Sequence, residues 1–289
     1  MTDKELQVRV MQHYQEALKW YPQTRIFGIF LQGSQNYYLD DEQSDVDTKV
    51  LVLPTLDEIV FNQKPVSTTH ILDNDEHIDA KDVRLYWQCF KKGNPNFVEI
   101  LFSRAYYINP RYREVWEVML KTREMIARVH PMAAAKAMMG MVQEKHHAME
   151  HRYPSRAHIV DKFGYDPKQL QHLIRMTWFL EAYVENIVHY EDILKLAIFA
   201  ADAPPETVRK YLLDIKRGRV YSLEEAREIA KTYLQEAEEA LKYAKENWPV
   251  DPDPMISAAM DNLLGEIIRS SIKMEIELEK DLEKERLER

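Results

Sequence analysis

The sequence predicts an α+β fold in which a small mixed β-sheet is followed by an all-helical region. Short runs rich in Ile, Val and Phe, bounded by Gly or Pro, occur only in the first part of the chain. After about residue 125, apolar residues recur at helical spacing in one segment after another. Glycine is scarce, with 7 in 289 residues, where average usage would give about 20. This scarcity favours long helices over Gly-rich turns.

The first part of the chain mixes helices with strands. The predicted elements are a helix over 3–20, strands over 25–33 and 46–54, a third strand within 77–87 and a helix over 110–129. Pro22 ends the first helix, and Pro110 begins the last one. Residues 55–77 are polar and mixed, which indicates a short helix or a lid. We therefore expect one α/β domain over residues 1–125.

The rest of the chain, residues 126–289, is predicted to form a helical domain. The expected helices cover about 131–151, 168–187, 191–201, 205–214, 222–247 and 254–289. No internal repeat and no low-complexity linker separates the two regions. We expect them to pack together and to close a cleft between them.

Composition excludes several classes of protein. The chain has 39 basic and 48 acidic residues, a net charge of −9, so contact with nucleic acid would need a local basic patch. The single cysteine, Cys89, excludes an internal disulfide framework and a Cys-only zinc site. The sequence contains neither a Gly-rich dinucleotide fingerprint nor a Walker-type phosphate loop. With no secretory signal or apolar run long enough to span a bilayer, we expect a cytoplasmic protein without membrane contact.

The most informative segment is IFLQGSQNYYLDDEQSDVDTKVLVL. After its first strand, Gly33 lets the backbone approach a phosphate closely, and Ser34 offers a hydroxyl and an N–H group. Asp45 and Asp47 alternate with Val46 at the start of the next strand, so both carboxylates share one face. Such a pair repels unless a divalent cation neutralises it, and Mg²⁺ prefers carboxylate and phosphate oxygens. Ser-Asp-Val-Asp alone could be a turn, but the preceding Gly-Ser favours a phosphate and metal site.

The stretch GSQNYYLDDEQSDVD, followed by an apolar strand, resembles the nucleotidyltransferase superfamily typified by DNA polymerase β. Three further stretches resemble a narrower group of bacterial and phage predicted nucleotidyltransferases, called YcgL-like or RlaP-like: DVRLYWQCFKKGNPNFVEILF, FGYDPKQLQHLIRM and LLDIKRGRVYSLEEA. The resemblance covers about residues 24–230. It implies a nucleotidyltransferase core, with Gly33 and Ser34 at the triphosphate, in which a hydroxyl attacks the α-phosphate and pyrophosphate leaves.

The resemblance also implies a metal site with three carboxylates. Asp45 and Asp47 would bind two Mg²⁺ ions, with Mn²⁺ as an alternative. Asp82, expected at the start of a DVRLY strand, is our first choice for the third carboxylate and for the general base that accepts the acceptor's proton. Asp79 is the alternative third carboxylate, and Asp82 could instead be a strand-end residue that faces water.

Basic residues further along the chain could bind the triphosphate. Lys168, His172 and Arg175 follow at i, i+4 and i+7, so they lie on one helix face that either lines the cleft or faces solvent. Lys216 stands in IKRGR, beside two arginines and Gly218. That pattern fits a phosphate or RNA backbone contact, and equally a helix C-terminus that glycine ends.

Three other residues near these motifs have a structural alternative. Tyr37 and Tyr38 lie between the Gly-Ser pair and the two aspartates, where they could stack on a base or anchor the loop to the core. Glu99 lies on a mainly apolar segment, and we expect it to be a buried carboxylate with its hydrogen bonds satisfied.

The predicted function is Mg²⁺-dependent transfer of a nucleoside monophosphate from a nucleoside triphosphate to a hydroxyl. The acceptor is either an RNA end or a hydroxyl on a protein or small molecule. The alternative is a module that binds a nucleotide or a partner without catalysis, such as a toxin-neutralising component. The residues leave the acceptor, the preferred base, the oligomeric state and the pathway undetermined.

Overall fold

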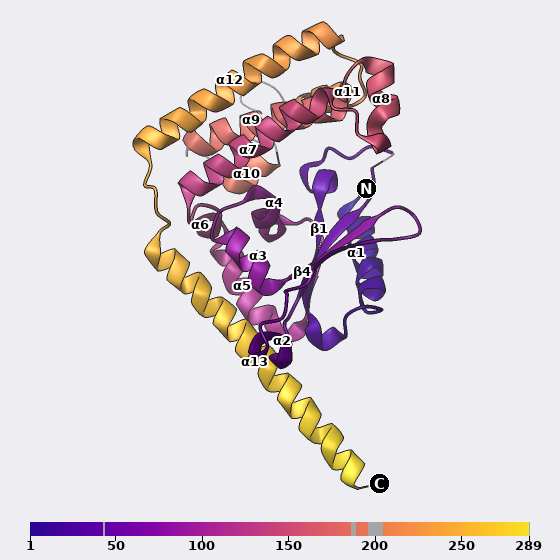
Figure 1. Cartoon of the computed structure of the whole chain (residues 1–289), viewed down its shortest axis with the longest axis vertical. Coiled ribbons are helices and arrows are strands. Elements are labelled where there is room, and N and C mark those ends of the chain that lie inside the picture. Colours follow the sequence, from indigo (N-terminus) through magenta and orange to yellow (C-terminus); the bar gives the residue numbers. More distant parts are fainter. Residues whose placement is uncertain (43, 186–188, 196–204, 289) are drawn as a thin grey trace.

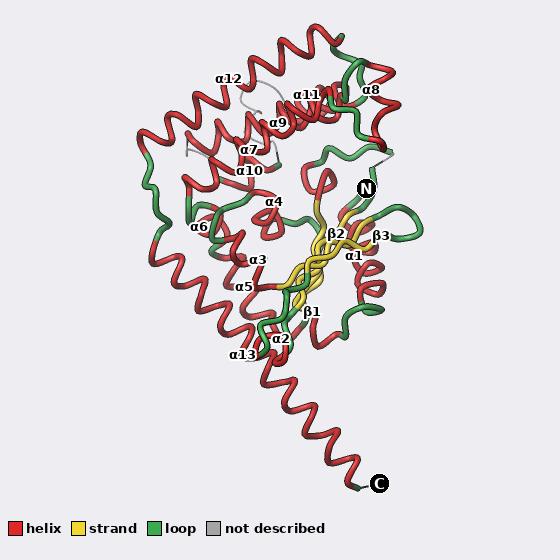
Figure 2. The backbone as a smooth tube through the Cα atoms, viewed as in Figure 1, coloured by secondary structure: helices red, strands yellow, loops and turns green. Residues whose placement is uncertain are grey.

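The structure, a computed structural model, describes residues 1–42, 44–185, 189–195 and 205–288. All strands of the described chain lie in the first 108 residues, and the chain after them is helical (Figures 1 and 2). The predicted α+β class, a small mixed sheet followed by helices, is confirmed.

In the described part of the chain the sheet has five strands, in the order β3-β4-β2-β1-β5. The strands are β1 (Ile26–Gln32), β2 (Asp47–Val52), β3 (Ser67–Ile71), β4 (His77–Asp82) and β5 (Tyr106–Ile108). β2 runs parallel to β4, and all other neighbours are antiparallel. Both strands predicted from apolar runs, β1 and β2, are confirmed. The edge strand β5, only three residues long, gave no periodic signal and was not predicted.

The third predicted strand ends earlier than the apolar pattern suggested. β4 stops at Asp82, and the following VRLYWQCF forms a helix, α3 (Val83–Phe90). Asp82 is the N-cap of this helix, and its carboxylate accepts a hydrogen bond from the Arg84 amide at 2.7 Å. The expected DVRLY strand was therefore wrong, because Asp followed by a run with a helical period is also an N-cap signal.

Each face of the sheet has its own cover. Helix α1 (Asp3–Ala17) packs on one face, where Leu6 and Val10 join apolar side chains of β1, β2 and β4. The other face meets α3, α4 (Pro95–Val98) and the helical part of the chain. This second core continues on both sides of residue 125. The division into domains at that position stays a prediction.

The helical part is built around α9, against which α7, α11 and α12 pack. Its helices are α5 (Arg113–Lys121), α6 (Arg123–Ala127), α7 (Pro131–Glu150), α8 (Ala157–Phe163), α9 (Pro167–Glu185), α10 (Tyr190–Leu194), α11 (Pro205–Lys216), α12 (Leu223–Asn247) and α13 (Pro254–Leu287). The predicted helix over 110–129 is interrupted at Thr122, and the seven-residue α8 was not predicted. Residues 186–187 of the predicted helix 168–187 and residues 196–201 of the predicted helix 191–201 lie outside the described residues.

Helix α13 runs back along the part of the chain that carries the sheet, residues 1–108, which we call the sheet-bearing part. Its last turns project beyond the rest of the molecule (Figure 1). The Trp87 indole of α3 donates a hydrogen bond to the Met260 carbonyl of α13 at 2.9 Å. Lys91 pairs with Asp261 at 2.7 Å. The C-terminal helix thus ties the two parts together.

Within the described ranges, the chain contains no helix that is both long enough and apolar enough to cross a membrane.

One carboxyl group in the helical part has a strongly shifted pKa. Burial raises the pKa of Glu181 on α9 to about 7 from an ordinary 4.5, and the charges of Glu236 and Glu185 add to the effect. Between these two pKa values the folded chain binds more protons than the unfolded chain does. Stability conferred by this site is therefore lost as the pH rises from about 4.5 to 7.

Replacing Glu181 by glutamine removes this penalty. We expect the Glu181→Gln variant to gain about 2 kcal/mol in unfolding free energy at pH 8, or roughly 5 °C in Tm, and almost nothing at pH 4. Thermal unfolding at the two pH values measures the difference. Glu238→Gln, at an exposed position of α12, is the control. An equal gain at both pH values would contradict the assignment.

Candidate functional site

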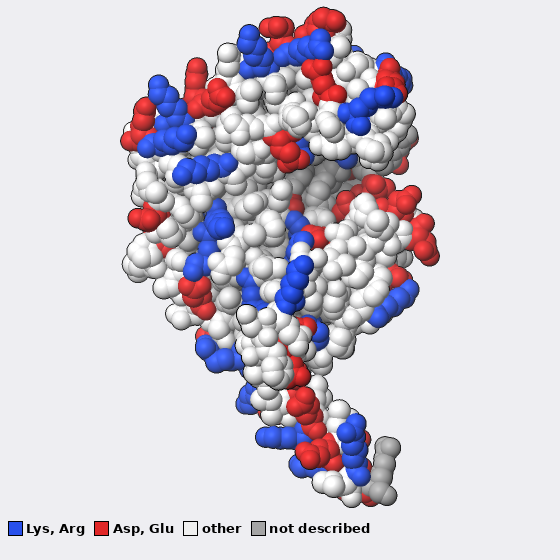
Figure 3. Space-filling model, in the orientation of Figure 1, with Lys and Arg blue, Asp and Glu red and all other residues white. Residues whose placement is uncertain are grey.

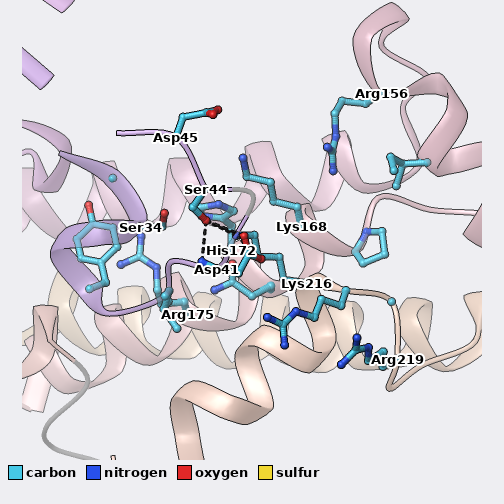
Figure 4. A pocket seen from close by; sticks show the side chains of 18 of the residues that line it. Ser34, Asp41, Ser44, Asp45, Arg156, Lys168, His172, Arg175, Lys216 and Arg219 are labelled. Carbon is cyan, nitrogen blue, oxygen red and sulfur yellow. Dashed lines mark hydrogen bonds and ion pairs between the residues drawn. The ribbon is translucent and has the colours of Figure 1, made fainter. Parts of the chain in front are cut away.

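A cleft of about 1090 Å³ separates the sheet-bearing part from the helices. Its walls come from three segments that are distant in sequence: residues 33–47, 156–175 and 216–219. Figure 3 shows a hollow between the two parts, with Asp and Glu gathered along its lower edge. The view into the pocket shows side chains of all three segments around one space (Figure 4).

The first wall begins where β1 ends. Gly33 opens a short 3-10 helix with φ of +78°, a conformation that favours glycine. A Cβ atom built on Gly33 would meet no atom within 4 Å, so the conformation, and not crowding, requires glycine. Ser34 follows directly, and both residues line the cleft.

Asp45 and Asp47 also line the cleft, whereas Val46 between them packs in the core beneath α1. Both aspartates are thus on the cleft side, although Asp45 precedes β2, which begins at Asp47. Asp47, whose side chain is 34% exposed, accepts a hydrogen bond from the His77 amide at 3.1 Å, and the His77 ring lies 3.3 Å away. Asp45 is exposed and has no hydrogen-bond or ion-pair partner in the part of the chain that the structure describes.

The second wall is the N-terminal half of α9. Of the two predicted alternatives for this helix face, lining the cleft or facing solvent, the structure shows the first. Lys168, His172 and Arg175 all line the cleft. Burial lowers the pKa of His172 well below its ordinary value, and the charges of Arg175 and Lys168 lower it further, so the ring is neutral at pH 7. Desolvation by the walls, then the charges of Lys216 and Arg156, lower the pKa of Lys168. An anion in the cleft would relieve this mutual repulsion of cations.

Two polar side chains on the floor of the cleft have atoms without partners. Arg175 is 6% exposed and lies over the Tyr37 ring at 4.2 Å, but its Nε has no hydrogen-bond partner among the described residues. The same holds for Nε2 of Gln171, which is 3% exposed. A buried unpaired donor costs about 1–3 kcal/mol. Sequence analysis missed Gln171, although its place at i+3 from Lys168 puts it on the predicted face.

Lys216, at the end of α11, connects the third wall to the first. Its ammonium group pairs with Asp41 at 3.1 Å and donates a hydrogen bond to Ser44 at 3.1 Å. Ser44 in turn donates to Asp41 at 2.9 Å. These contacts, shown in part by the dashed lines of Figure 4, join the loop that carries the two aspartates to the helical part. Asp41 was not among the predicted site residues.

Because Lys216 already has an acidic partner, a bound triphosphate would have to compete with Asp41 for it. We expect Asp41→Asn to lower the Kd for a triphosphate by about three- to tenfold. Isothermal titration of the variant and the wild type measures this change. Glu42→Gln removes a charge from the neighbouring cleft residue and is the control for general electrostatics. Weaker binding by Asp41→Asn would mean that the pair preorganises the site.

The charges of the cleft are segregated. Among the described residues, seven Lys or Arg line it, all on the helical side, whereas the four Asp or Glu that line it lie in 41–47. Three of the cations have carboxylate partners: Arg156 with Asp166, Lys216 with Asp41 and Arg219 with Asp214. The other four, Lys162, Lys168, Arg175 and Arg217, form no ion pair within the described chain. The lining residues of a chain with a net charge of −9 thus sum to +3, seven minus four, before the two carboxylates outside the lining, Asp166 and Asp214, are counted.

Asp82 does not reach the cleft, which corrects its assignment as the third carboxylate. In the parallel register of β2 and β4, Asp82 lies opposite Val52, at the far end of the strands from Asp47. Its carboxylate is buried and bonds the Arg84 guanidinium at 2.7 Å. Asp79 is on the cleft side of the sheet but pairs with Lys81 at 3.3 Å and does not line the cleft either.

Tyr37 lines the cleft, and both Tyr37 and Tyr38 make side-chain contacts outside their loop. The Tyr37 hydroxyl donates a hydrogen bond to Glu99, which also pairs with Lys49 at 3.4 Å. Glu99 is therefore a buried carboxylate with partners, as predicted. Two guanidinium groups lie over the Tyr38 ring, that of Arg104 at 3.9 Å and that of Arg209 at 4.5 Å from its centre.

The donors of the cleft suit a magnesium ion only in part. Among the described residues no three His, Cys, Asp or Glu side chains gather so as to hold a metal. Asp45 and Asp47 provide two carboxylates on one face, and Mg²⁺ is typically held by one or two carboxylates together with substrate phosphates and water. The pair thus fits Mg²⁺ when a triphosphate supplies the remaining oxygens.

Comparison with known proteins yields a distant structural likeness. No model of a protein family matches the chain, and no curated protein matches it. Among solved structures, a nucleotidyltransferase-like protein from Exiguobacterium sibiricum 255-15 aligns with 82% of this chain and 74% of its own length, at 11% sequence identity and a TM-score of 0.31. A likeness this distant assigns neither a family nor an activity to the chain.

Proposed function

We propose that the protein is a Mg²⁺-dependent nucleotidyltransferase that moves a nucleoside monophosphate from a nucleoside triphosphate to a hydroxyl acceptor. One observation carries the proposal. The cleft that Asp45 and Asp47 line is also lined by four cations that have no carboxylate partner in the described chain. Acidic and basic groups so segregated suit a ligand that binds a metal at one side and presents negative charge at the other.

Each wall has its own task in this proposal. Gly33 and Ser34 approach the phosphates through backbone and hydroxyl groups. Lys168 and Arg175 bind phosphate oxygens, with Lys216 joining them once it leaves Asp41. Neutral His172 can donate one hydrogen bond without adding charge. Mg²⁺, when held by the carboxylate pair and the phosphates, supplies neutralisation of charge on the transferring group.

In the transfer, the acceptor oxygen forms a bond to the α-phosphorus and the bond between the α-phosphorus and the bridging oxygen breaks. The electron pair leaves with pyrophosphate. With Asp82 outside the cleft, the proton of the attacking hydroxyl passes to a carboxylate of residues 41–47, the segment that supplies every acidic residue of the cleft. The acceptor is an RNA end or a hydroxyl of a protein or small molecule.

The first test offers each α-labelled nucleoside triphosphate with Mg²⁺ to the wild type, and total RNA or total protein as acceptor in separate tubes. Label that enters one acceptor with the wild type, but not with Asp45→Asn, supports the proposal and names the acceptor class and the base. Asp79→Asn makes the same chemical change outside the cleft and should retain transfer. Absence of both label and pyrophosphate would favour a small-molecule acceptor or a binding module without catalysis.

A further inference from the structure

A buried polar network lies behind the Asp45-Val46-Asp47 segment, on the face of the sheet that α1 covers. At its centre is Glu76, in the turn between β3 and β4, which is buried together with His13 of α1. Neither residue lines the cleft, and sequence analysis singled out neither. The network therefore serves something other than direct contact with a ligand.

Glu76 and His13 together contact the chain on both sides of Asp47. The Glu76 carboxylate accepts a hydrogen bond from the Val46 amide at 3.3 Å. Its other oxygen lies 2.8 Å from Nε2 of His13, whose Nδ1 lies 2.9 Å from the Thr48 hydroxyl. Val46 and Thr48 are the immediate neighbours of Asp47.

The turn that carries Glu76 also contacts Asp47 itself. The amide of His77, the next residue, donates to the Asp47 carboxylate at 3.1 Å, and its ring lies 3.3 Å from the same oxygen. His77 thus holds the Asp47 side chain directly. Glu76 and His13 hold it indirectly, through contacts with the neighbouring residues Val46 and Thr48. A shift of the Glu76 turn would move the carboxylate as well.

Stability alone is a poor explanation for this network. Arg9 pairs with Glu76 at the edge of the buried region. Burial raises the pKa of Glu76, but hydrogen bonds from His13 and Asn74 and the charge of Arg9 outweigh it and keep the pKa below its ordinary value. Replacing a buried ion pair by apolar side chains of similar volume is often neutral or stabilising. A charged group kept here fits a role in orientation, as outer partners of metal-binding carboxylates commonly have.

We propose that Glu76 and His13 are positioning residues that orient the Asp47 carboxylate toward the cation and the triphosphate. This inference rests on the proposed function. It assigns to α1, which has no residue in the cleft, a part in setting the geometry of the site. Glu76 and His13 do not contact the ligand in this proposal. They act through Val46 and Thr48, the two neighbours of Asp47.

The test compares Glu76→Gln with Glu58→Gln. Glu58 forms a similar pair with Arg25 at 2.7 Å in the same part of the molecule but away from the cleft. For each protein, Tm is measured while Mg²⁺ is titrated in the presence of a non-hydrolysable triphosphate analogue, and transfer is measured in parallel. We expect Glu76→Gln to raise the half-saturating Mg²⁺ concentration about tenfold or more and to lower kcat. Glu58→Gln should lower Tm without changing either quantity.

Two outcomes separate failure of this inference from failure of the proposed function. If the wild type shows no Mg²⁺-dependent stabilisation by the analogue and no transfer, the proposed function is wrong. If the wild type shows both, and Glu76→Gln has the same Mg²⁺ midpoint and the same kcat per folded molecule, the network is merely structural and the inference is overturned. Should Glu76→Gln fold poorly, His13→Gln, which retains an amide near Glu76 but loses the contact to Thr48, gives the same comparison.

Discussion

Replacing Asp47 by asparagine is expected to lower the rate of nucleotidyl transfer by about a thousandfold. The substitution removes one of the two carboxylates, Asp45 and Asp47, that we propose hold the cation at the cleft. It leaves the amide oxygen in place to accept the hydrogen bond from His77. The Asp47 side chain is 34% exposed, so its replacement leaves no buried charge without a partner, and we expect the fold to be retained. Single-turnover transfer measured beside a thermal melt separates the chemical effect from any structural one.

Asp79→Asn is the matched control for this prediction. Asp79 lies on the neighbouring strand and on the same side of the sheet, but it does not line the cleft. Transfer by Asp79→Asn should stay within about twofold of the wild type. If Asp47→Asn retained its activity, the cation site we propose would be wrong. If Asp79→Asn lost activity as severely as Asp47→Asn, the third carboxylate would be Asp79.

Asp82→Ala is expected to have the opposite profile, with a large loss of stability and unchanged transfer per folded molecule. The Asp82 side chain is 1% exposed, caps α3 and bonds Arg84 with both oxygens. Removing it leaves a helix end and a partly buried guanidinium without their partner, at a cost of about 3 kcal/mol. Chemical denaturation measures the loss. Asp82→Asn, which can still cap the helix, should lose less.

Activity separates this assignment from the one that the family resemblance implied. A third metal-binding carboxylate and general base at Asp82 would make Asp82→Asn as inactive as Asp47→Asn. A variant that is stable enough to purify and transfers normally would establish that Asp82 serves only the fold. A folded but inactive variant would return Asp82 to the site and require the parallel register of β2 and β4 to be wrong.

Local patterns predicted the cleft residues well because each pattern depends on a short stretch of chain. Alternation around Val46 predicted that both aspartates share one side, and both line the cleft. Helical spacing predicted that Lys168, His172 and Arg175 share one face of α9, and all three line the cleft. The Gly33-Ser34 pair was predicted to follow the first strand and lie at the site, and Gly33 does so with a positive φ. The structure adds that these segments meet at one cleft.

Positions that depend on strand register were beyond such patterns. Asp82 follows a strand and precedes apolar residues, so the local sequence fits both the end of a strand and the cap of a helix. The choice depends on the register between β2 and β4. In that register Thr48 lies opposite Ile78 and Val52 opposite Asp82, so His77, and not Asp82, contacts Asp47. Asp41 and Gln171 were missed for a similar reason, since only the packing of α9 and α11 against the loop brings them to the cleft.

The path of α13 has a consequence for how the chain folds during synthesis. The sheet is complete once β5 has been made, but the contact between Trp87 and Met260 joins positions 173 residues apart. At about 5–20 residues per second, the ribosome needs roughly ten seconds or more to deliver that partner. During this interval the surface of α3 that α13 later covers is exposed to solvent. The nascent chain therefore has a period of aggregation risk that ends only when α13 emerges.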